Sequence, residues 1–249
     1  KKVLDIIGLP ESLPRREINA VGIIGAGTMG GGIAMNFANV GIPAHIIETS
    51  QDQLDKGIFN ISNNYERSVN RGKVSKEEVT DRLKLITSST RLTDLGHCDL
   101  IIEAVYEDLD LKKNIFKELD QIARPFSILA TNTSALDINQ IALSTIRPDD
   151  VIGLHFFSPA NVMKLVEIVR AKFTSDVVVA TSLSLVKKIN KIPTIVGVCP
   201  GFVGNRILFA RQKQALNMVY NGLMPWDIDK ALNDFGFKMG PFQMSDLAG

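Results

Sequence analysis

The sequence predicts an α/β protein with a doubly wound, mostly parallel sheet, followed by the start of an all-helical C-terminal domain. From Ala20 onward, short apolar segments alternate with segments of helical periodicity, as expected where helices cover both faces of a parallel sheet. The strand segments are almost continuously apolar, which is typical of strands buried on both faces. After Cys199 the helical patterns continue without a further strand, and this change predicts the second domain.

The individual elements follow from these patterns. A strand is expected just before Gly25, and further strands are expected at residues 43–48, 84–87, 99–104, 127–131, 151–156, 164–169 and 192–198. Helices are expected at residues 30–40, 51–71, 108–123, 136–142 and 175–190, with a helical excursion in the charged segment 72–84. Beyond Cys199, helices are expected at residues 202–221 and 224–235, and a turn at Gly240 and Pro241.

Three parts are therefore expected along the chain. Residues 1–19 carry Pro10, Pro14 and a charged cluster, and we interpret them as a connector outside the core. Residues 20–198 form the sheet domain, and residues 199–249 begin a helical domain that we expect to be incomplete. A chain that opens mid-pattern in this way suggests a piece of a longer polypeptide.

Composition excludes several classes of function. An apolar content of 45% and a charged content of 22% are ordinary for a soluble globular protein of this length. A net charge of +1 gives no reason to expect nucleic acid or an acidic membrane surface as a partner. No apolar run approaches a membrane span or a signal-peptide core. Cys98 and Cys199 lack metal-ligand spacing, so we expect reduced thiols, no bound metal and an intracellular compartment.

The most informative motif is AVGIIGAGTMGGGIA, at residues 20–34. Gly25 allows a tight turn, Gly27 leaves room for a pyrophosphate to approach the backbone, and Gly30 lets the helix pack on the strand. The free N–H groups of the following helix point at the phosphates. The next strand ends in an acid, Glu48, about 20 residues on. Together these features predict a Rossmann-type dinucleotide-binding domain.

Glu48 also indicates which dinucleotide is bound. A carboxylate at this position accepts hydrogen bonds from the ribose hydroxyls and repels a 2′-phosphate, and residues 49–51 include no arginine. We therefore expect NAD rather than NADP. The alternative is a solvated residue at the end of a strand.

One of the three histidines is a candidate for chemistry. His45 is interpreted as a core or partly buried residue, and His97 as a solvated loop residue. His155 lies at the carboxyl end of a buried strand, where ligands bind in open parallel sheets, and can accept a proton near neutral pH. Glu167 lies in the next apolar strand and needs a partner, for which His155 is the obvious candidate. The alternative to a catalytic pair is a structural ion pair.

Four further polar residues occupy positions from which they could reach a ligand. Ser134 follows a buried strand at the same edge, and Asn205 stands in the first turn of the helix that opens the second domain. Both could bind a substrate oxygen, although each alone could be a cap or turn residue. Glu107 and Lys112 fall where they could reach the nicotinamide half of a dinucleotide, but taken alone they are expected to be surface charges.

These segments together resemble the L-3-hydroxyacyl-CoA dehydrogenase family. The resemblance runs from about Ala20 to the last residue, through residues 25–34, 103–113, 132–136, 155–169, 200–206 and 235–249. The connector and the ending resemble the dehydrogenase part of multifunctional β-oxidation enzymes of the peroxisomal bifunctional type, where a hydratase domain precedes it.

The resemblance implies oxidation of L-3-hydroxyacyl-CoA to 3-ketoacyl-CoA with hydride transfer to NAD. His155 would be the base, Glu167 would orient it, and Ser134 and Asn205 would hold the substrate oxygen. The implied cofactor contacts are Gly25, Gly27, Thr28, Met29, Gly30, Glu48, Ala104, Val105, Glu107, Lys112 and Asn132. Asn161 stands where many relatives have a histidine, and we assign it no catalytic role.

Two other classes of function remain open. One is a dehydrogenase of another β-hydroxy acid, although such enzymes use a lysine in a different motif. The other is an NAD(H)-binding module with a sensing or structural role. We expect an acyl-CoA substrate, no nucleic acid, no membrane span, a homodimer through the helical domain and an upstream hydratase domain. A peroxisomal setting is favoured over a mitochondrial or bacterial cytoplasmic one.

Overall fold

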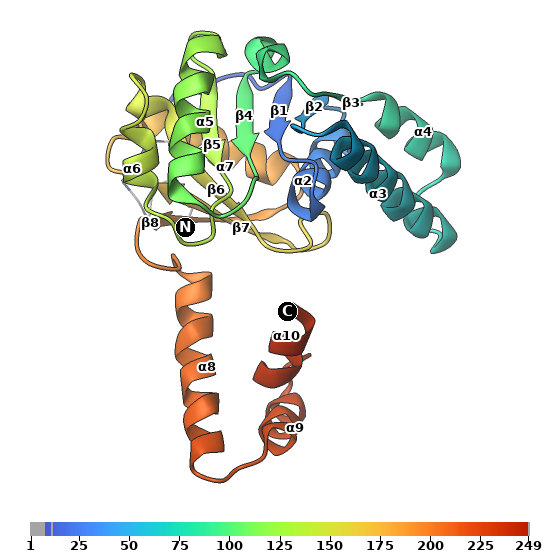
Figure 1. Cartoon of the computed structure of the whole chain (residues 1–249), viewed down its shortest axis with the longest axis vertical. Helices are drawn as coiled ribbons and strands as arrows, with labels where there is room; N and C mark the ends of the chain where they lie inside the picture. Colours follow the sequence, from blue (N-terminus) through green and yellow to red (C-terminus); the bar gives the residue numbers. More distant parts are fainter. Residues whose placement is uncertain (1–7, 11, 249) are drawn as a thin grey trace. The chain divides into compact units, whose positions relative to one another are not determined.

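A computed structural model describes residues 8–10 and 12–248 of the chain (Figure 1). These residues fall into two compact units, with the division between Pro200 and Gly201. The first unit holds the sheet and the second is helical. The predicted α/β fold class, with a Rossmann-type sheet followed by helices, is confirmed. Among the described residues, no helix is long and apolar enough to span a membrane.

The first unit is built on one eight-stranded sheet with the order β3-β2-β1-β4-β5-β6-β7-β8. The six strands from β3 to β6 run parallel, in the 3-2-1-4-5-6 order of a dinucleotide-binding fold. Strand β7 is antiparallel to β6, and β8 is parallel to β7. The strands are β1 (Val21–Ile24), β2 (Ala44–Ile47), β3 (Ile86–Ser89), β4 (Leu100–Glu103), β5 (Ile128–Thr131), β6 (Val151–Phe156), β7 (Leu165–Arg170) and β8 (Ile192–Gly197).

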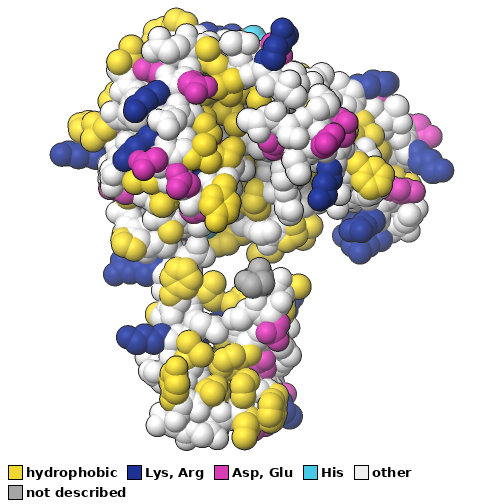
Figure 2. Space-filling view, viewed as in Figure 1, with side chains coloured by type: hydrophobic (Ala, Val, Ile, Leu, Met, Phe, Trp, Pro, Cys, Tyr) yellow, Lys and Arg dark blue, Asp and Glu magenta, His cyan; other side chains and the backbone are white. Residues whose placement is uncertain are grey.

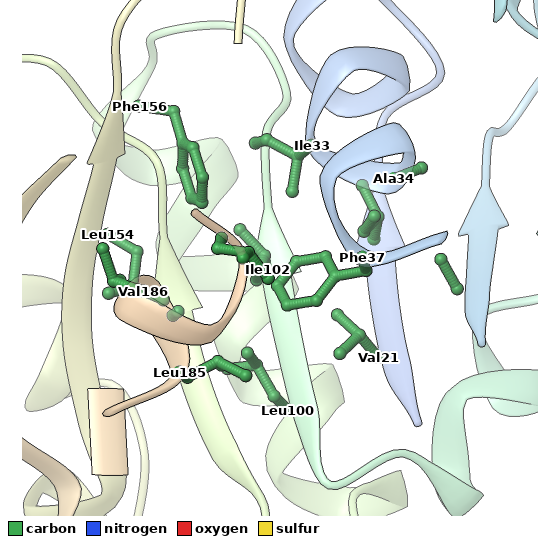
Figure 3. Packing of buried hydrophobic residues seen from close by; sticks show 14 of the residues in the cluster. Val21, Ile33, Ala34, Phe37, Leu100, Ile102, Leu154, Phe156, Leu185 and Val186 are labelled. Carbon is green, nitrogen blue, oxygen red and sulfur yellow. The ribbon is translucent and has the colours of Figure 1, made fainter. Parts of the chain in front are cut away.

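Helices cover both faces of this sheet. Figure 3 shows side chains of α2 and α7 meeting those of β1 and β4 in one layer, with Phe37 near its centre. The opposite face is covered by α5, α6 and the short helix η1, whose Leu95 lies against Gly22. The helices of this unit are α2 (Thr28–Ala38), α3 (Gln51–Asn70), α4 (Lys76–Lys84), η1 (Leu92–His97), α5 (Leu109–Ile122), α6 (Ile138–Ala142), η2 (Pro148–Asp150) and α7 (Asp176–Lys188).

The N-terminal segment is attached to the sheet unit. The Asp99 carboxylate accepts the backbone N–H of Asn19 at 2.7 Å, and Arg16 forms an ion pair of 2.6 Å with Asp150. Leu9 and Ile18 are buried in the same hydrophobic layer as α2 and α7. The segment expected to lie outside the core therefore contributes two residues to it. Residues 1–7 and residue 11 of the connector lie outside the described residues.

The helical unit consists of α8 (Gly204–Tyr220), α9 (Pro225–Phe235) and α10 (Pro241–Ala248), which contact one another. The sequence predicts only a turn at Gly240 and Pro241, so the third helix is an addition to the expected elements. Its first turn is capped by Asp229 of α9, which accepts the N–H groups of Phe242 and Gln243 at 2.9 and 3.0 Å. Figure 2 shows hydrophobic side chains gathered on one face of this unit. The exposed hydrophobic residues of the unit include Met218, Leu223 and Trp226.

Candidate active site

The glycine turn between β1 and α2 has the geometry that its three glycines require. Gly25 has a φ of 104°, and a Cβ there would lie 2.7 Å from the carbonyl oxygen of Ala104 at the end of β4. A Cβ on Gly30 would overlap the carbonyl oxygen of Gly25. A Cβ on Gly27 would meet no atom of the described residues within 4 Å. The first two glycines therefore close the turn, whereas Gly27 leaves open space in front of the helix.

This open space faces the N-terminus of α2. Gly27 and Thr28 are exposed, Met29 is half-buried, and no side chain caps the helix. Backbone N–H groups and the positive end of the helix dipole are thus presented to an anion. The switch in strand order falls between β1 and β4, and the loop after β4 carries the predicted cofactor residues Ala104 and Val105.

Glu48 is fastened to the glycine turn. Its Oε2 accepts the backbone N–H of Ala26 at 3.1 Å, and its Oε1 accepts the N–H of Thr49 at 2.8 Å. The side chain stays half-exposed at the end of β2, next to β1. This arrangement presents a fixed carboxylate beside the turn, where the ribose of a dinucleotide would lie.

His155 and Glu167 form a buried pair. They face each other in the antiparallel register of β6 and β7, and His155 Nδ1 lies 2.7 Å from Glu167 Oε2. The residues are 6% and 1% exposed. An ionised Glu167 accepts a hydrogen bond from Nδ1–H, so the neutral imidazole carries its lone pair on Nε2. The Phe157 ring packs against the imidazole with 4.4 Å between centroids.

Neighbouring polar side chains hold the end of β6 in place. Asn132, just after β5, accepts the N–H of Phe156 at 2.9 Å through its side-chain oxygen. The expected cofactor residue Asn132 is thus also a brace for the backbone next to His155. The other two histidines are engaged elsewhere: His45 is half-buried and bonds Thr87 and Ser89 of β3, and His97 is exposed at the end of η1.

Glu107 organises the loop that carries Ser134. One carboxylate oxygen accepts hydrogen bonds from the Thr133 hydroxyl at 2.7 Å and from the N–H and hydroxyl of Ser134 at 2.8 and 3.0 Å. Burial raises the pKa of Glu107, but these hydrogen bonds and the charge of Lys112 outweigh it and leave the pKa below its usual value. Glu107 therefore stays ionised near neutral pH.

Lys112 is not the surface charge that its sequence context alone suggests. It is 1% exposed, and its Nζ lies 2.6 Å from Glu103, a completely buried carboxylate at the end of β4. Glu103 also accepts the Thr131 hydroxyl at 2.7 Å and the Val105 N–H at 2.8 Å. Burying the charges is tolerated because each has a partner and further hydrogen bonds. Sequence reasoning missed Glu103, although an acid at the end of an apolar strand is the signal that identified Glu48.

Asn205 lies in the first turn of α8, as the sequence predicts, and belongs to the helical unit. The expected role of Asn205 toward a substrate oxygen stays a prediction.

A large cleft of about 790 Å³ runs beside α2 in the sheet unit. It begins at Gly27 and Thr28, and its walls come from α2, from α3, α4 and the connection between them, and from the loop between β6 and β7. Five basic residues and no carboxylate line it among the described residues, and the basic residues are Arg67, Arg71, Lys73, Arg82 and Lys164. The cleft is therefore suited to an anionic ligand. No sequence motif signals it, because its residues are scattered over several elements.

Family models account for nearly all of the chain. Residues 20–199 match the NAD binding domain of 3-hydroxyacyl-CoA dehydrogenase, and residues 201–249 match the C-terminal domain of the same enzyme. The chain belongs to the 3-hydroxyacyl-CoA dehydrogenase family. This finding agrees with the resemblance that the motifs indicate, and it assigns NAD as the cofactor of the sheet unit.

Individual relatives fall into two groups. The peroxisomal bifunctional enzyme of Cavia porcellus is 46% identical over 234 residues, which are 94% of this chain and 32% of that protein. The 3-hydroxybutyryl-CoA dehydrogenase of Clostridioides difficile is 42% identical over 229 residues, which are 91% of this chain and 82% of that protein. The chain thus spans about a third of the length of the bifunctional relatives.

A solved structure is similar over most of the chain. The crystal structure of (S)-3-hydroxybutyryl-CoA dehydrogenase from Ralstonia eutropha matches with a TM-score of 0.91 and 37% identity, over 94% of this chain and 83% of that one. The glycine turn fits the cofactor of this family: Gly27 leaves the space that a Cβ would fill, and Glu48 presents its carboxylate beside it.

Proposed function

We propose that this chain oxidises L-3-hydroxyacyl-CoA to 3-ketoacyl-CoA with NAD, a step of fatty-acid β-oxidation. The observation that carries the proposal is the buried His155–Glu167 pair, in a sheet whose β1–α2 turn is built for a dinucleotide. Membership of the family supports the same reaction, and relatives bear the names 3-hydroxybutyryl-CoA dehydrogenase and peroxisomal bifunctional enzyme.

His155 is the proposed base. With Nδ1 bonded to Glu167, Nε2 accepts the proton of the substrate 3-hydroxyl, and the ionised Glu167 stabilises the imidazolium that results. NAD, when bound, supplies the acceptor for the hydride that leaves C3. Ser134 and Asn205 are proposed to bind the oxygen at C3. Glu107 fixes the Ser134 backbone and hydroxyl and so prepares that position.

The proposed cofactor contacts surround the glycine turn. The backbone from Gly25 to Gly30 would receive the pyrophosphate, and Glu48 would bind the adenosine ribose. The loop after β4 and the residues after β5 would contact the rest of NAD, as Ala104, Val105, Glu107 and Asn132 are proposed to do. Lys112 is proposed to support the cofactor site indirectly, by holding Glu103, because its ammonium group is buried against that carboxylate.

The basic cleft is the proposed site for the phosphorylated end of the acyl-CoA. Coenzyme A carries several phosphate charges, and Arg67, Arg71, Lys73, Arg82 and Lys164 supply positive charge without a competing carboxylate in the lining. A free β-hydroxy acid would leave this cleft unused. The cleft therefore favours a CoA ester over a small acid as substrate.

The experiment that tests this proposal is a substrate panel on the full-length protein. NADH formation is followed by absorbance with the CoA ester of 3-hydroxybutyrate, with the free acid, and with NADP in place of NAD. Efficient turnover is expected only with the CoA ester and NAD. Equal activity on the free acid would contradict the substrate assignment, and tight NADH binding without turnover of any acyl-CoA would indicate a binding module instead.

The setting of the enzyme is part of the same proposal. We infer a peroxisomal location and a hydratase domain upstream of the connector, because bifunctional peroxisomal enzymes are among the relatives and the chain spans 32% of one of them. Exposed hydrophobic side chains on the helical unit support a homodimer through that unit. Cell fractionation and light scattering of the native protein test these points.

A further inference from the structure

Lys191, at the junction of α7 and β8, is a buried cation that the proposed reaction does not use. The residue is 7% exposed, and its Nζ donates hydrogen bonds to the carbonyl oxygens of Ala160 at 2.6 Å and Met163 at 2.7 Å. A buried ammonium group is costly unless it is well bonded. Lys191 therefore holds two points of the loop between β6 and β7 at a fixed distance from the start of β8.

The same loop is also held by α2. The buried side chain of Asn36 donates to the Ala160 carbonyl at 3.0 Å, so that oxygen accepts from Asn36 and Lys191 together. Gly32 lets the loop approach closely, since a Cβ there would lie 3.0 Å from the Asn161 nitrogen. The loop therefore packs closely against α2, the helix that begins at the glycine turn.

This loop connects the proposed catalytic pair and forms a wall of the basic cleft. It leaves β6 after His155 and returns in β7 to Glu167. Pro159, Asn161, Val162 and Lys164 line the cleft together with residues of α2 and α3. The width of the cleft therefore depends on the contacts that seat residues 160–163.

Lys191 also adds charge behind this wall. Burial and the nearby Lys164 lower the pKa of Lys191 to about 8, so the side chain is still largely protonated at neutral pH. A charged ammonium group forms stronger hydrogen bonds to carbonyl oxygens than a neutral donor does.

We propose that Lys191 is a positioning residue for substrate binding, which seats residues 160–163 so that they form the wall of the acyl-CoA cleft. Asn36 shares this task through the Ala160 carbonyl. The inference rests on the proposed function insofar as the ligand of the cleft is an acyl-CoA.

The test compares Lys191→Met with Lys187→Met in the full-length protein. Methionine keeps an unbranched stem and removes the ammonium group, and Lys187 is an exposed lysine in the last turn of α7, four residues before Lys191. The affinity for acetoacetyl-CoA is measured by calorimetry and the affinity for NADH by fluorescence. In Lys191→Met, acetoacetyl-CoA binding should weaken about tenfold and NADH binding less than about twofold. Lys187→Met should leave both affinities unchanged.

A double-mutant cycle with Asn36→Ala separates positioning from a general loss of stability. Because Lys191 and Asn36 bond the same carbonyl, their effects on acetoacetyl-CoA binding should be non-additive. Should Lys191→Met fail to fold, Lys191→Gln and Asn36→Ala are compared with wild type, and each should weaken acetoacetyl-CoA binding selectively.

Unchanged acetoacetyl-CoA binding in folded variants would overturn the inference, as would an equal loss of NADH and acetoacetyl-CoA binding. Because the experiment measures acetoacetyl-CoA binding and not turnover, its outcome is separate from the test of the proposed function. A wild-type protein that binds acetoacetyl-CoA but does not turn it over would contradict the function, while the effect of Lys191→Met on that binding would still decide the inference.

Discussion

At the residue scale, the site depends on carboxylates that are buried and fully bonded. Glu167 is 1% exposed and lies 2.7 Å from His155 Nδ1, and Glu103 is completely buried and bonded to Lys112. A buried charge of this kind is costly unless it is paired, so each carboxylate fixes the side chain that it meets. Glu167 thereby sets the tautomer of His155, and Glu103 fixes Lys112.

Glu167→Gln tests this ordering role. An amide oxygen can still accept from Nδ1–H but carries no charge to stabilise the imidazolium, so kcat should fall by about 10²-fold. NADH binding, measured by fluorescence, should be unchanged. Glu118→Gln, on an exposed position of α5, is the control. A kcat near that of wild type would show that Glu167 is only a structural partner.

The lowered pKa of Lys191 predicts how the stability of the fold changes with pH. Its pKa is lowered by burial and by Lys164 from 10.5 to about 8, so between these values the unfolded chain binds more protons than the folded one. The contribution of Lys191 to stability is therefore complete above pH 10.5 and is lost as the pH falls toward 8. When urea unfolding is measured as the pH is lowered from 10.5 to 8, wild type should lose stability relative to Lys191→Met. A difference that is constant with pH would contradict the lowered pKa.

At the element scale, short connections decide how the chain is arranged. Only eight residues separate β6 from β7, too few for a helical crossover, and the two strands are antiparallel. This reversal places Glu167 directly opposite His155. In the helical unit, a short connection that ends at Gly240 separates α9 from α10. Helix α10 begins at Pro241, and Asp229 of α9 caps its first turn.

Gly240→Ala should destabilise this helical turn. A Cβ on Gly240 would overlap Asp229, so either the cap or the backbone must move, at a cost of about 1–3 kcal/mol. Amide hydrogen exchange at Phe242 and Gln243 should become faster. Gly197→Ala, where a Cβ meets no described atom within 4 Å, should leave exchange at these amides unchanged. Equal protection in both variants would mean that the cap tolerates a side chain at Gly240.

At the scale of the whole molecule, the near-zero net charge hides a local concentration of positive charge. The chain carries a formal net charge of +1, yet five basic residues line the cleft beside α2. Such a site attracts a phosphorylated ligand through a field that salt screens, with a Debye length of about 8 Å at physiological ionic strength.

Ionic strength should therefore separate two substrates that share an acyl group. Raising salt from about 0.05 to 0.5 M should weaken the apparent binding of the CoA ester several-fold in steady-state kinetics, because screening weakens phosphate binding. The N-acetylcysteamine thioester of the same hydroxy acid lacks the phosphates, so its Michaelis constant should change little. A parallel change for both thioesters would exclude the cleft as the phosphate site.

Much of this fold could be predicted from the sequence, because periodicity and the glycine motif are local signals. Strand β6 and helix α9 have the expected place, and the Rossmann-type sheet is confirmed. Helix α2 begins two residues before the expected position, since Thr28 and Met29 already belong to the helix. Strand β3 is shifted by two residues to Ile86–Ser89, where it pairs with β2.

What could not be predicted depends on contacts between distant residues. Burial of Lys112 requires Glu103 and Thr131, and the cap on α10 requires Asp229. The hydrogen bonds that hold residues 160–163 come from Asn36 of α2 and from Lys191, just before β8. No period or motif signals these pairs. The antiparallel direction of β7 is different, because the short loop before it is a local signal that predicts an antiparallel strand.

The most direct measurement is the rate at which His155→Gln forms NADH from the CoA ester of 3-hydroxybutyrate. Loss of the base should lower kcat by about 10²- to 10⁴-fold, with NADH binding retained, whereas His97→Gln at the exposed end of η1 should resemble wild type. A His155→Gln enzyme that retains a rate within a few fold of wild type would contradict the assignment of His155 and Glu167 as the catalytic pair.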